Sequence, residues 1–535
     1  MTTAQPAAVV VLAAGAGTRM RSATPKVLHA LAGRTILGHA LAAAQATDPD
    51  RIAVVVRHER DRVAAEAVAR VPSALVVDQD DVPGTGRAVQ CALSSLDAVA
   101  QAAAVRDEPG ELPHGVDGPV LVLAGDIPLI DGATLTALVE AHVAGRNAVT
   151  VLTAIVPDAT GYGRILRDDA GEVVAIVEHK DATDAQREVR EINSSIFVFD
   201  AGVLRGALGR LGTDNAQGEV YLTDVLAIAR TDGGKVRAVV APDPALVEGV
   251  NDRVQLATLG AQLNRRLLEA HMRAGVTIVD PASTWTDVDV ELGQDVTVLP
   301  GTQLHGTTRV GAGATVGPDT TLRDVVVGEG ATVTRTHGSG AVVGEGAEVG
   351  PFAFLRPGAD LGAEGKIGAF VEVKNSQIGE GAKVPHLTYV GDATIGEHTN
   401  IGAGAIFANY DGVAKHRTVI GAYVKSGSGT RFVAPVTVGD GAYTGAGAVV
   451  REDVPAGALA VSGGAQHTVE GWVERRRAGS SSAQAAALAR EASVAHLSPQ
   501  ARAERDQAAA AHHVDRPTPA TPATPSGPHE GDSAR

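Results

Sequence analysis

One stretch of the chain, residues 384–412, combines imidazole, phenol and amide side chains that could act on a polar substrate. A histidine can serve as a general base, and phenol and amide groups can hold a substrate by hydrogen bonds. Around these side chains, pairs of an aliphatic residue and glycine recur along the chain. Such a repeat does not need imidazole, phenol or amide groups, so we interpret the polar side chains as a candidate site. These side chains are His386, Tyr389, Asn400, Asn409 and Tyr410.

A second set of reactive side chains lies in the amino-terminal half. An apolar run leads into small residues and then Arg19 and Lys26, and a turn of small residues lets backbone N–H groups approach phosphates. Asp126 follows another apolar run, where a carboxylate at the end of a buried strand suits Mg²⁺. Gln79 and the small residues 83–86 form a further turn that could admit a base. A tight turn without a ligand, and a helix cap at Asp126, remain open alternatives.

The elements that must position this second set are strands buried on both faces, because their apolar runs do not alternate with polar residues. Helical stretches separate the runs, which predicts a mostly parallel, Rossmann-like sheet. An amphipathic helix from Asp252 to His271 follows, ending before Gly275. The predicted strands are Val9–Ala13, Ile52–Val56, Leu75–Val77, Val120–Leu123 and Val149–Ile155.

The first set lies in a repeat of about six residues in which an aliphatic side chain precedes glycine. Val310, Val316 and Val327 begin a series that continues to Val438. One short strand and one turn per repeat, with three sides per coil, predict a left-handed parallel β-helix of hexapeptide repeats. The repeat fails from Ala405 to Lys415, which predicts a loop leaving the coil.

Composition sets further bounds. A length of 535 residues predicts two or three domains, and the net charge of −16 argues against a general nucleic-acid binder. Cys91 is the only cysteine, which allows no internal disulfide and is typical of a reducing cytoplasm. The apolar run 7–14 is too short to span a membrane and no cation precedes it. Segment 107–118 reads as a surface loop, and the Ala-, Pro- and Ser-rich tail 478–535 as disordered apart from a transient helix over 483–511.

Six motifs in order resemble the sugar-1-phosphate nucleotidyltransferases, most closely the uridylyltransferase half of the bifunctional N-acetylglucosamine-1-phosphate uridylyltransferase/glucosamine-1-phosphate acetyltransferases. They are LAAGAGTRM, PKVL at 25–28, GYGR at 161–164, VEHK at 177–180, EIN at 191–193 and GVN at 249–251. The resemblance implies UTP as substrate, Arg19 and Lys26 as catalytic cations, and Mg²⁺ on Asp126 and Asn251. The implied residues around UDP-N-acetylglucosamine are Leu12, Ala13, Ala14, Gly15, Lys26, Gln79, Gly84, Thr85, Gly163, Glu178, Asn193 and Asn251.

The repeat is similar to the acetyltransferase half of the same family through LRPG, FVEVK, HLTYVGDATIG, NIGAGAIFANYDG and APVTVGDGA. The resemblance implies His386 as general base and a homotrimer that builds the acetyl site between subunits. It also implies Arg356, Lys374, Tyr389 and Asn400 around glucosamine 1-phosphate, and Ala403, Asn409, Tyr410, Ser428 and Ala446 around acetyl-CoA. One departure is Gly463, where the family usually has an arginine associated with the coenzyme.

We therefore predict a cytoplasmic bifunctional enzyme that acetylates glucosamine 1-phosphate with acetyl-CoA and then couples the product to UTP. Its partners are small-molecule substrates, with neither nucleic acid nor membrane among them. The predicted domains are 1–250 for uridylyl transfer, a linker helix 251–275, an acetyltransferase β-helix 276–477 and the tail 478–535. Two alternatives remain: a uridylyltransferase whose β-helix only assembles the trimer, and a non-catalytic sugar-nucleotide sensor.

Overall fold

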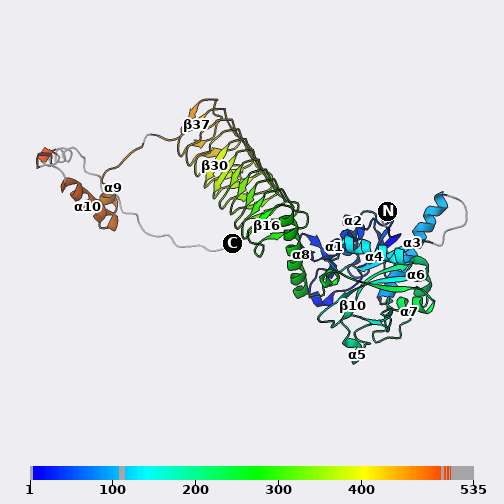
Figure 1. Cartoon of the computed structure of the whole chain (residues 1–535). Helices are drawn as coiled ribbons and strands as arrows, with labels where there is room; N and C mark the ends of the chain where they lie inside the picture. The colour runs from blue at the N-terminus through cyan, green and yellow to red at the C-terminus, as the bar shows by residue number, and fades with distance from the viewer. Residues whose placement is uncertain are drawn as a thin grey trace, which may run out of the picture. The chain divides into compact units, whose positions relative to one another are not determined.

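The computed structural model describes residues 4–107, 115–464, 466–495, 499–501, 503–504 and 507. The chain divides into two compact units, Met1–Ser462 and Gly463–Arg535. The first contains an α/β domain followed by a parallel β-helix, as the sequence predicts (Figure 1). The boundaries of the four predicted domains remain predictions.

The α/β domain is built on a sheet of mixed direction with the strand order β11-β7-β10-β6-β1-β4-β5. Its central strands β4, β1 and β6 are parallel, as predicted, whereas β10 is antiparallel to both β6 and β7. The path strands are β1 Ala8–Leu12, β4 Ile52–Val56, β5 Leu75–Asp78, β6 Pro119–Ala124, β7 Val149–Ile155, β10 Glu191–Asp200 and β11 Val236–Val240. Strands β8 Arg164–Arg167 and β9 Val173–Val177 extend the sheet, and β2 Ala30–Leu31 pairs with β3 Arg34–Thr35.

Helices cover both faces of this sheet, which explains why its central strands β1, β4 and β6 are apolar throughout. Helices α1 Ile36–Gln45, α2 Arg60–Arg70 and α4 Gly132–Gly145 pack in one core cluster. Helices α3 Thr85–Asp107, α6 Ala201–Leu208 and α7 Asp224–Thr231 pack in the other. The shorter elements are η1 Thr18–Met20, η2 Lys26–Leu28, α5 Asp184–Arg187 and η3 Pro244–Val247. Of the predicted loop at 107–118, residues 108–114 lie outside the described residues.

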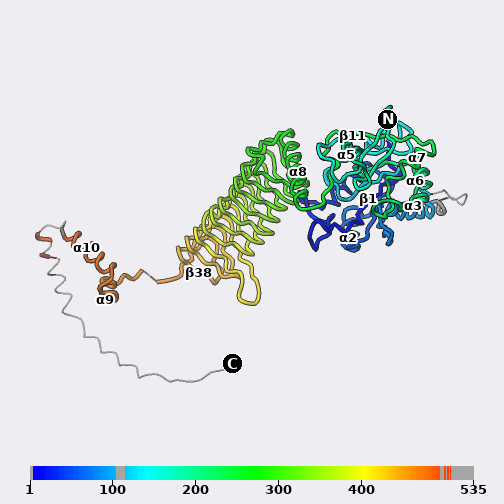
Figure 2. Tube along the Cα trace, turned by 90° about the horizontal axis from the view of Figure 1, so that it is seen from below, coloured from blue at the N-terminus to red at the C-terminus, as the bar shows by residue number. Residues whose placement is uncertain are grey.

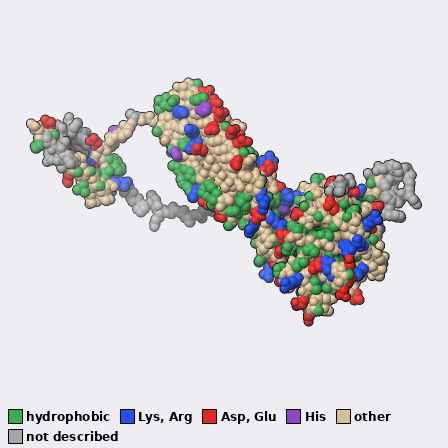
Figure 3. Space-filling model, viewed as in Figure 1, with side chains coloured by type: hydrophobic (Ala, Val, Ile, Leu, Met, Phe, Trp, Pro, Cys, Tyr) green, Lys and Arg blue, Asp and Glu red, His purple; other side chains and the backbone are tan. Residues whose placement is uncertain are grey.

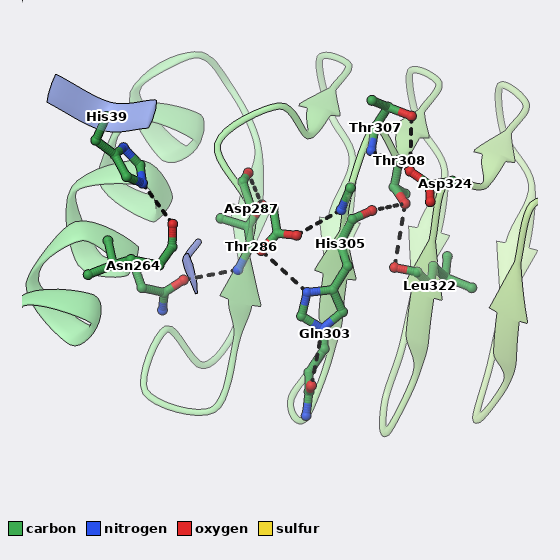
Figure 4. Close-up of polar contacts among 12 residues, drawn as sticks. His39, Asn264, Thr286, Asp287, Gln303, His305, Thr307, Thr308, Leu322 and Asp324 are labelled. Carbon is green, nitrogen blue, oxygen red and sulfur yellow. Dashed lines mark hydrogen bonds and ion pairs between the residues drawn. The ribbon is translucent and has the colours of Figure 1, made fainter. Parts of the chain in front are cut away.

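Helix α8, Arg253–Arg273, confirms the predicted amphipathic helix. The Asp252 side chain accepts hydrogen bonds from Val254 N and Gln255 N, which satisfies N–H groups that the first turn leaves free. The Asn264 side chain then joins the helix to the first coil: its Nδ2 lies 2.8 Å from Thr284 O and its Oδ1 lies 3.0 Å from Thr286 N. Figure 4 shows this amide reaching from the helix toward Thr286.

The β-helix stacks short parallel strands on three faces. The first face holds β12 Thr277–Ile278, β15 Thr297–Val298, β18 Thr315–Val316, β21 Thr332–Val333, β24 Glu348–Val349, β27 Lys366–Ala369 and β30 Lys383–His386. The second holds β13 Trp285–Thr286, β16 Gln303–His305, β19 Thr321–Arg323, β22 His337–Ser339, β25 Phe354–Leu355, β28 Glu372–Lys374, β31 Tyr389–Gly391, β33 Ile406–Ala408, β35 Arg431–Val433 and β38 Val449–Val450. The third holds β14 Glu291–Leu292, β17 Arg309–Val310, β20 Val326–Val327, β23 Val342–Val343, β26 Ala359–Leu361, β29 Ser376–Ile378, β32 Ala393–Ile395, β34 Thr418–Ile420 and β36 Val436–Val438. Strands β37 Tyr443–Thr444 and β39 Leu459–Ala460 pair near the end.

The aliphatic residues of the repeat fill the inside of the coils. Val310, Val316 and Val327 are each at most 3% exposed, and the same core cluster continues to Val454. The small and polar residues between them lie outside. In Figure 3 the visible surface of the coils is mostly backbone and uncharged side chains, with acidic and basic side chains along its edges. This division explains how a chain with only 3% aromatic residues builds a long core.

The predicted loop starts later than the sequence suggests. Residues 406–408 remain in the coil as β33, which pairs with both β31 and β35. The chain leaves the coil after them, and Tyr410 and Lys415 form an antiparallel bridge within the excursion. In Figure 2 a yellow loop stands out from the stacked coils. In the second unit, helices α9 Trp472–Arg476 and α10 Ser481–Ala495 are described; the tail from 508 onward lies outside the described residues.

Candidate active sites

The first candidate site lies where the carboxyl ends of β1 and β6 meet. These neighbouring parallel strands end side by side, and Gly125 N donates to Leu12 O at 2.8 Å. Asp126 therefore follows β6 next to the small-residue turn that follows β1. A Cβ atom added to Gly15 would meet no heavy atom within 4 Å, so the turn has open space beside it. Such a turn can admit a phosphate.

Two cation–oxygen pairs form the centre of this site. Lys26 Nζ lies 2.5 Å from Asp126 Oδ2, and Arg19 Nη2 lies 2.7 Å from Asn251 Oδ1. The two pairs are tied together because Val250 N donates to Asp126 O at 2.9 Å. The structure thus brings together all four residues that the sequence assigns to catalysis and metal binding in this half.

A second group borders the turn between β5 and α3. Gln79 Nε2 donates to Val82 O and Gly84 O, which closes this turn. A Cβ atom at Gly84 would lie 2.3 Å from Val220 O, and φ is +120° there, so this close approach requires glycine. Thr85 Oγ1 accepts from Leu222 N at 3.2 Å.

The residues predicted to contact the sugar also gather. Asn193 N donates to Gly163 O at 2.9 Å, and the Glu178 carboxylate lies 3.3 Å from the position of a Cβ atom at Gly163. Burial raises the pKa of Glu178, and the nearby carboxylates Asp181 and Asp224 raise it further. This group of residues therefore includes a carboxylate that takes up a proton more readily than an exposed glutamate.

The second candidate site lies in the β-helix at the corner between its second and third faces. Lys374 ends β28, and in the next coil Tyr389 and Gly391 of β31 pair with Glu372 and Lys374. Asn409 follows β33 in the coil after that, and its Nδ2 lies 3.4 Å from Tyr389 Oη. One coil before Lys374, Arg356 is bound to Glu372 at 2.9 Å.

Sequence reasoning missed two residues at this corner, Asp392 and Lys415. Asp392 is 8% exposed and accepts hydrogen bonds from the side-chain amides of Asn375 and Asn409. The adjacent Lys374 lowers the pKa of Lys415, while Asp392 and Tyr389 oppose that effect, which places Lys415 beside these three groups. A spacing of seventeen residues between Asn375, Asp392 and Asn409 is the sequence signal that could have identified the cluster.

Four more of the predicted residues of this half lie along the corner between the first and second faces. His386 O accepts from Gly404 N at 3.1 Å, Ala403 O from Gly429 N at 2.7 Å, and Ser428 O from Gly447 N at 2.8 Å. His386, Ala403, Ser428 and Ala446 thus border one line of small residues. The His386 side chain is exposed at the start of this line. Tyr410 lies in the loop, 60% exposed, with its hydroxyl donating to Gly412 O.

The two corners remain separate among the described residues of one chain. Asn400 bridges Lys383 and Lys425 on the first face, and no hydrogen bond joins its side chain or that of His386 to Lys374, Tyr389 or Asn409. Gly463, which stands where the family usually has arginine, has φ of +117°, so an arginine would be strained there.

Comparisons with known proteins cover both halves. A family model described as a MobA-like NTP transferase domain matches residues 9–188. The bifunctional protein GlmU of Kineococcus radiotolerans is 61% identical over 491 residues, covering 92% of this chain and 96% of that protein. The bifunctional protein GlmU of Pseudarthrobacter chlorophenolicus is 62% identical, covering 90% and 96%, and that of Mycolicibacterium smegmatis is 57% identical, covering 91% and 98%. Separately, no helix among the described residues has the length and apolar character to cross a membrane.

Proposed function

The chain belongs to the family of bifunctional GlmU proteins, and from this we propose that it makes UDP-N-acetylglucosamine in two steps at two separate sites. It is both a glucosamine-1-phosphate acetyltransferase and an N-acetylglucosamine-1-phosphate uridylyltransferase. The first activity uses acetyl-CoA and the second uses UTP. The acetyl reaction belongs to the β-helix, and the uridylyl reaction belongs to the α/β domain.

One observation carries this proposal: the similarity to bifunctional relatives covers 92% of the chain. The remaining 8% is far shorter than either half, so the match must include both candidate sites. A uridylyltransferase with only a scaffold β-helix is therefore not favoured. Assaying thiol release and pyrophosphate release with each sugar phosphate in turn tests the proposal.

In the uridylyl reaction the phosphate oxygen of N-acetylglucosamine 1-phosphate attacks the α-phosphorus of UTP, and pyrophosphate leaves. Negative charge is spread over phosphoryl oxygens, so positioned cations supply most of the stabilisation. Arg19 and Lys26 face this charge from the turn after β1. Gln79, Gly84 and Thr85 border the uridine, and Gly163, Glu178 and Asn193 border the sugar.

Asp126 and Asn251 have the donor types that Mg²⁺ prefers, a carboxylate oxygen and an amide oxygen. Both oxygens already contact a side-chain cation, Lys26 or Arg19, so positive charge is favoured at this point. Mg²⁺ held there would supply Lewis-acid stabilisation of the negative charge on the UTP phosphates. Mg²⁺ and the two oxygen ligands are part of the proposal.

In the acetyl reaction the 2-amino group of glucosamine 1-phosphate attacks the thioester carbon of acetyl-CoA, and the coenzyme thiol leaves. His386 takes the proton from the amine, because a protonated amine has no lone pair to attack with. Arg356 and Lys374 bind the phosphate, with Tyr389 and Asn400 on the sugar. Ala403, Asn409, Tyr410, Ser428 and Ala446 border the coenzyme, and a backbone N–H near Ala403 stabilises the oxyanion.

The separation of the two corners supports a trimeric arrangement in which neighbouring chains complete each acetyl site. In one chain the corner with His386 and the corner with Lys374 lie at opposite edges of the second face. A homotrimer would set the corner with His386 of one chain against the corner with Lys374 of its neighbour, as closed cyclic symmetry allows. A cytoplasmic location and small-molecule substrates complete the proposal.

A further inference from the structure

Asp392 is the centre of a buried polar cluster, and the acetyl chemistry described above gives this carboxylate no role. Asn375 Nδ2 lies 2.6 Å from Asp392 Oδ1, and Asn409 Nδ2 donates to Asp392 Oδ2. Lys374 Nζ lies 3.9 Å from the same Oδ2. The two amides come from the coil before and the coil after, so the carboxylate links three coils at one corner.

The surroundings keep this carboxylate ionised. Burial acts to raise the pKa of Asp392, but the hydrogen bonds from Asn375 and Asn409 and the charges of Lys374 and Lys415 outweigh burial and lower the pKa. An ionised carboxylate only accepts hydrogen bonds. Both amides must therefore turn their Nδ2 groups, and not their oxygens, toward Asp392.

This constraint fixes the free face of Asn409. With Nδ2 held by Asp392, the Oδ1 atom of Asn409 points away from the carboxylate, and it accepts no hydrogen bond from the described residues. We propose that Asp392 is a positioning residue for acetyl transfer, which holds the Asn409 amide so that Oδ1 accepts an N–H group of a bound substrate. The inference rests on the proposed acetyltransferase function.

Two sources could supply that N–H group: the 2-amino group of glucosamine 1-phosphate, or an amide of the coenzyme's extended arm. Both present the same donor to Asn409 Oδ1. The Michaelis constants of the two substrates distinguish these sources, because only the substrate that contacts Oδ1 loses a hydrogen bond when the amide turns.

The alternative is that Asp392 only forms the turn between the second and third faces. Its φ of +50° is left-handed, and aspartate is among the residues that tolerate this conformation. Asp324 occupies the same corner four coils earlier with φ of +54°, but it is exposed and accepts from Thr307 N and Thr307 Oγ1 (Figure 4). Backbone conformation therefore explains the residue type at both corners, but not the pair of side-chain amides on Asp392.

The test begins with Asp392→Asn, which keeps the size of the side chain and tolerates the same backbone. One of its two acceptor oxygens becomes an NH2 group, which cannot accept a hydrogen bond, so Asn409 loses its partner or turns over when this group faces it. We expect kcat/KM for acetyl transfer to fall about tenfold or more, with a raised KM for the substrate that contacts Oδ1. Pyrophosphate release from UTP and N-acetylglucosamine 1-phosphate should stay unchanged.

Two further variants separate positioning from stability. Asp324→Asn makes the same chemical change at the equivalent corner, and its acetyl kcat/KM should stay within about twofold of wild type. Asn409→Asp added to Asp392→Asn restores the hydrogen bond with reversed polarity and still presents an oxygen to the substrate. We expect this double variant to regain about tenfold over Asp392→Asn.

The proposal is overturned if folded Asp392→Asn keeps wild-type acetyl kcat/KM, or if the double variant regains none of the lost activity. If Asp392→Asn does not fold, the double variant decides alone: it must transfer acetyl groups faster than Asn409→Asp. Absence of thiol release from wild-type enzyme would instead refute the proposed acetyltransferase function, before any variant is made.

Discussion

The ammonium group of Lys26 lies 2.5 Å from a carboxylate oxygen of Asp126, although one hundred positions separate them in the chain. Both side chains are partly buried, with 13% and 24% of their surfaces exposed. The ammonium thus binds the oxygen that we propose as a Mg²⁺ ligand, so the two cations would compete for one carboxylate. In the proposed reaction, the nucleotide phosphates would offer Lys26 an alternative partner once Asp126 held Mg²⁺.

Replacing Lys26 should therefore separate metal binding from catalysis. Lys26→Met removes the competing charge, so Mg²⁺ should bind the substrate-free enzyme about threefold more tightly or better. Uridylyl transfer should fall about 100-fold or more, since a cation that stabilises phosphoryl charge is lost. Titration calorimetry with Mg²⁺ gives the first quantity. Lys235→Met, a change at a lysine that donates to Gly145 O, should leave Mg²⁺ affinity unchanged. Weaker Mg²⁺ binding by Lys26→Met would contradict the competition.

Asp126→Ala should abolish Mg²⁺-dependent pyrophosphate release while thiol release from acetyl-CoA continues. The carboxylate is the only charged oxygen that we assign to the metal, and its removal leaves Lys26 without its partner. Coupled assays for pyrophosphate and for free thiol measure both reactions on the same preparation. Unchanged pyrophosphate release would exclude Asp126 as an important ligand.

His386→Ala should abolish acetyl transfer, by about 100-fold or more, because a general base is lost. Synthesis of UDP-N-acetylglucosamine from pre-acetylated sugar phosphate should be spared, since His386 lies in the β-helix and Asp126 in the α/β domain. Loss of both activities in a folded protein would refute the division of labour between the two halves.

The raised pKa of Glu178 predicts how sugar binding depends on pH. As pH falls, this carboxylate takes up a proton at a higher pH than an exposed glutamate would, and it then no longer accepts hydrogen bonds at both oxygens. The KM for N-acetylglucosamine 1-phosphate should therefore rise on mild acidification in the wild type. Glu178→Gln, which does not titrate, should show a flatter profile. Identical profiles for the two enzymes would contradict this role.

The Asn264 amide should stabilise the junction between α8 and the first coil. Asn264→Leu leaves Thr284 O and Thr286 N unpaired in a buried place, at a cost of about 1–3 kcal/mol for each group. The Thr286 amide should then exchange its hydrogen faster. Arg265→Ala, on the exposed side of the same helix, breaks only a surface ion pair with Glu269 and should change little. Slow exchange at Thr286 in Asn264→Leu would show that the amide is not needed.

The local pattern of apolar residues predicted the fold well because residues near one another in the sequence specify each strand and coil. Ile52–Val56 and Val149–Ile155 match their strands end to end, since runs rich in β-branched residues, without charged residues, mark strands buried on both faces. The antiparallel direction of β10 was not predicted, because direction depends on the path of the connecting chain and not on the strand's own residues.

The sites were harder to predict than the fold because their contacts are long-range. The motifs identified Asn409 and Lys374, but Asp392 follows a glycine and looks like an ordinary corner residue. Its partners lie one coil away on either side, and only stacking of the coils brings them together. The pairing of Lys26 with Asp126 likewise depends on the sheet placing β1 beside β6.

The most direct test of two sites in one chain is to assay thiol and pyrophosphate release by the wild-type enzyme with each sugar phosphate. Glucosamine 1-phosphate and acetyl-CoA should release thiol, whereas N-acetylglucosamine 1-phosphate and UTP should release pyrophosphate without acetyl-CoA. Glucosamine 1-phosphate and UTP should yield pyrophosphate only after acetyl-CoA is added. Pyrophosphate release without any thiol release would contradict the account and leave the β-helix as a scaffold.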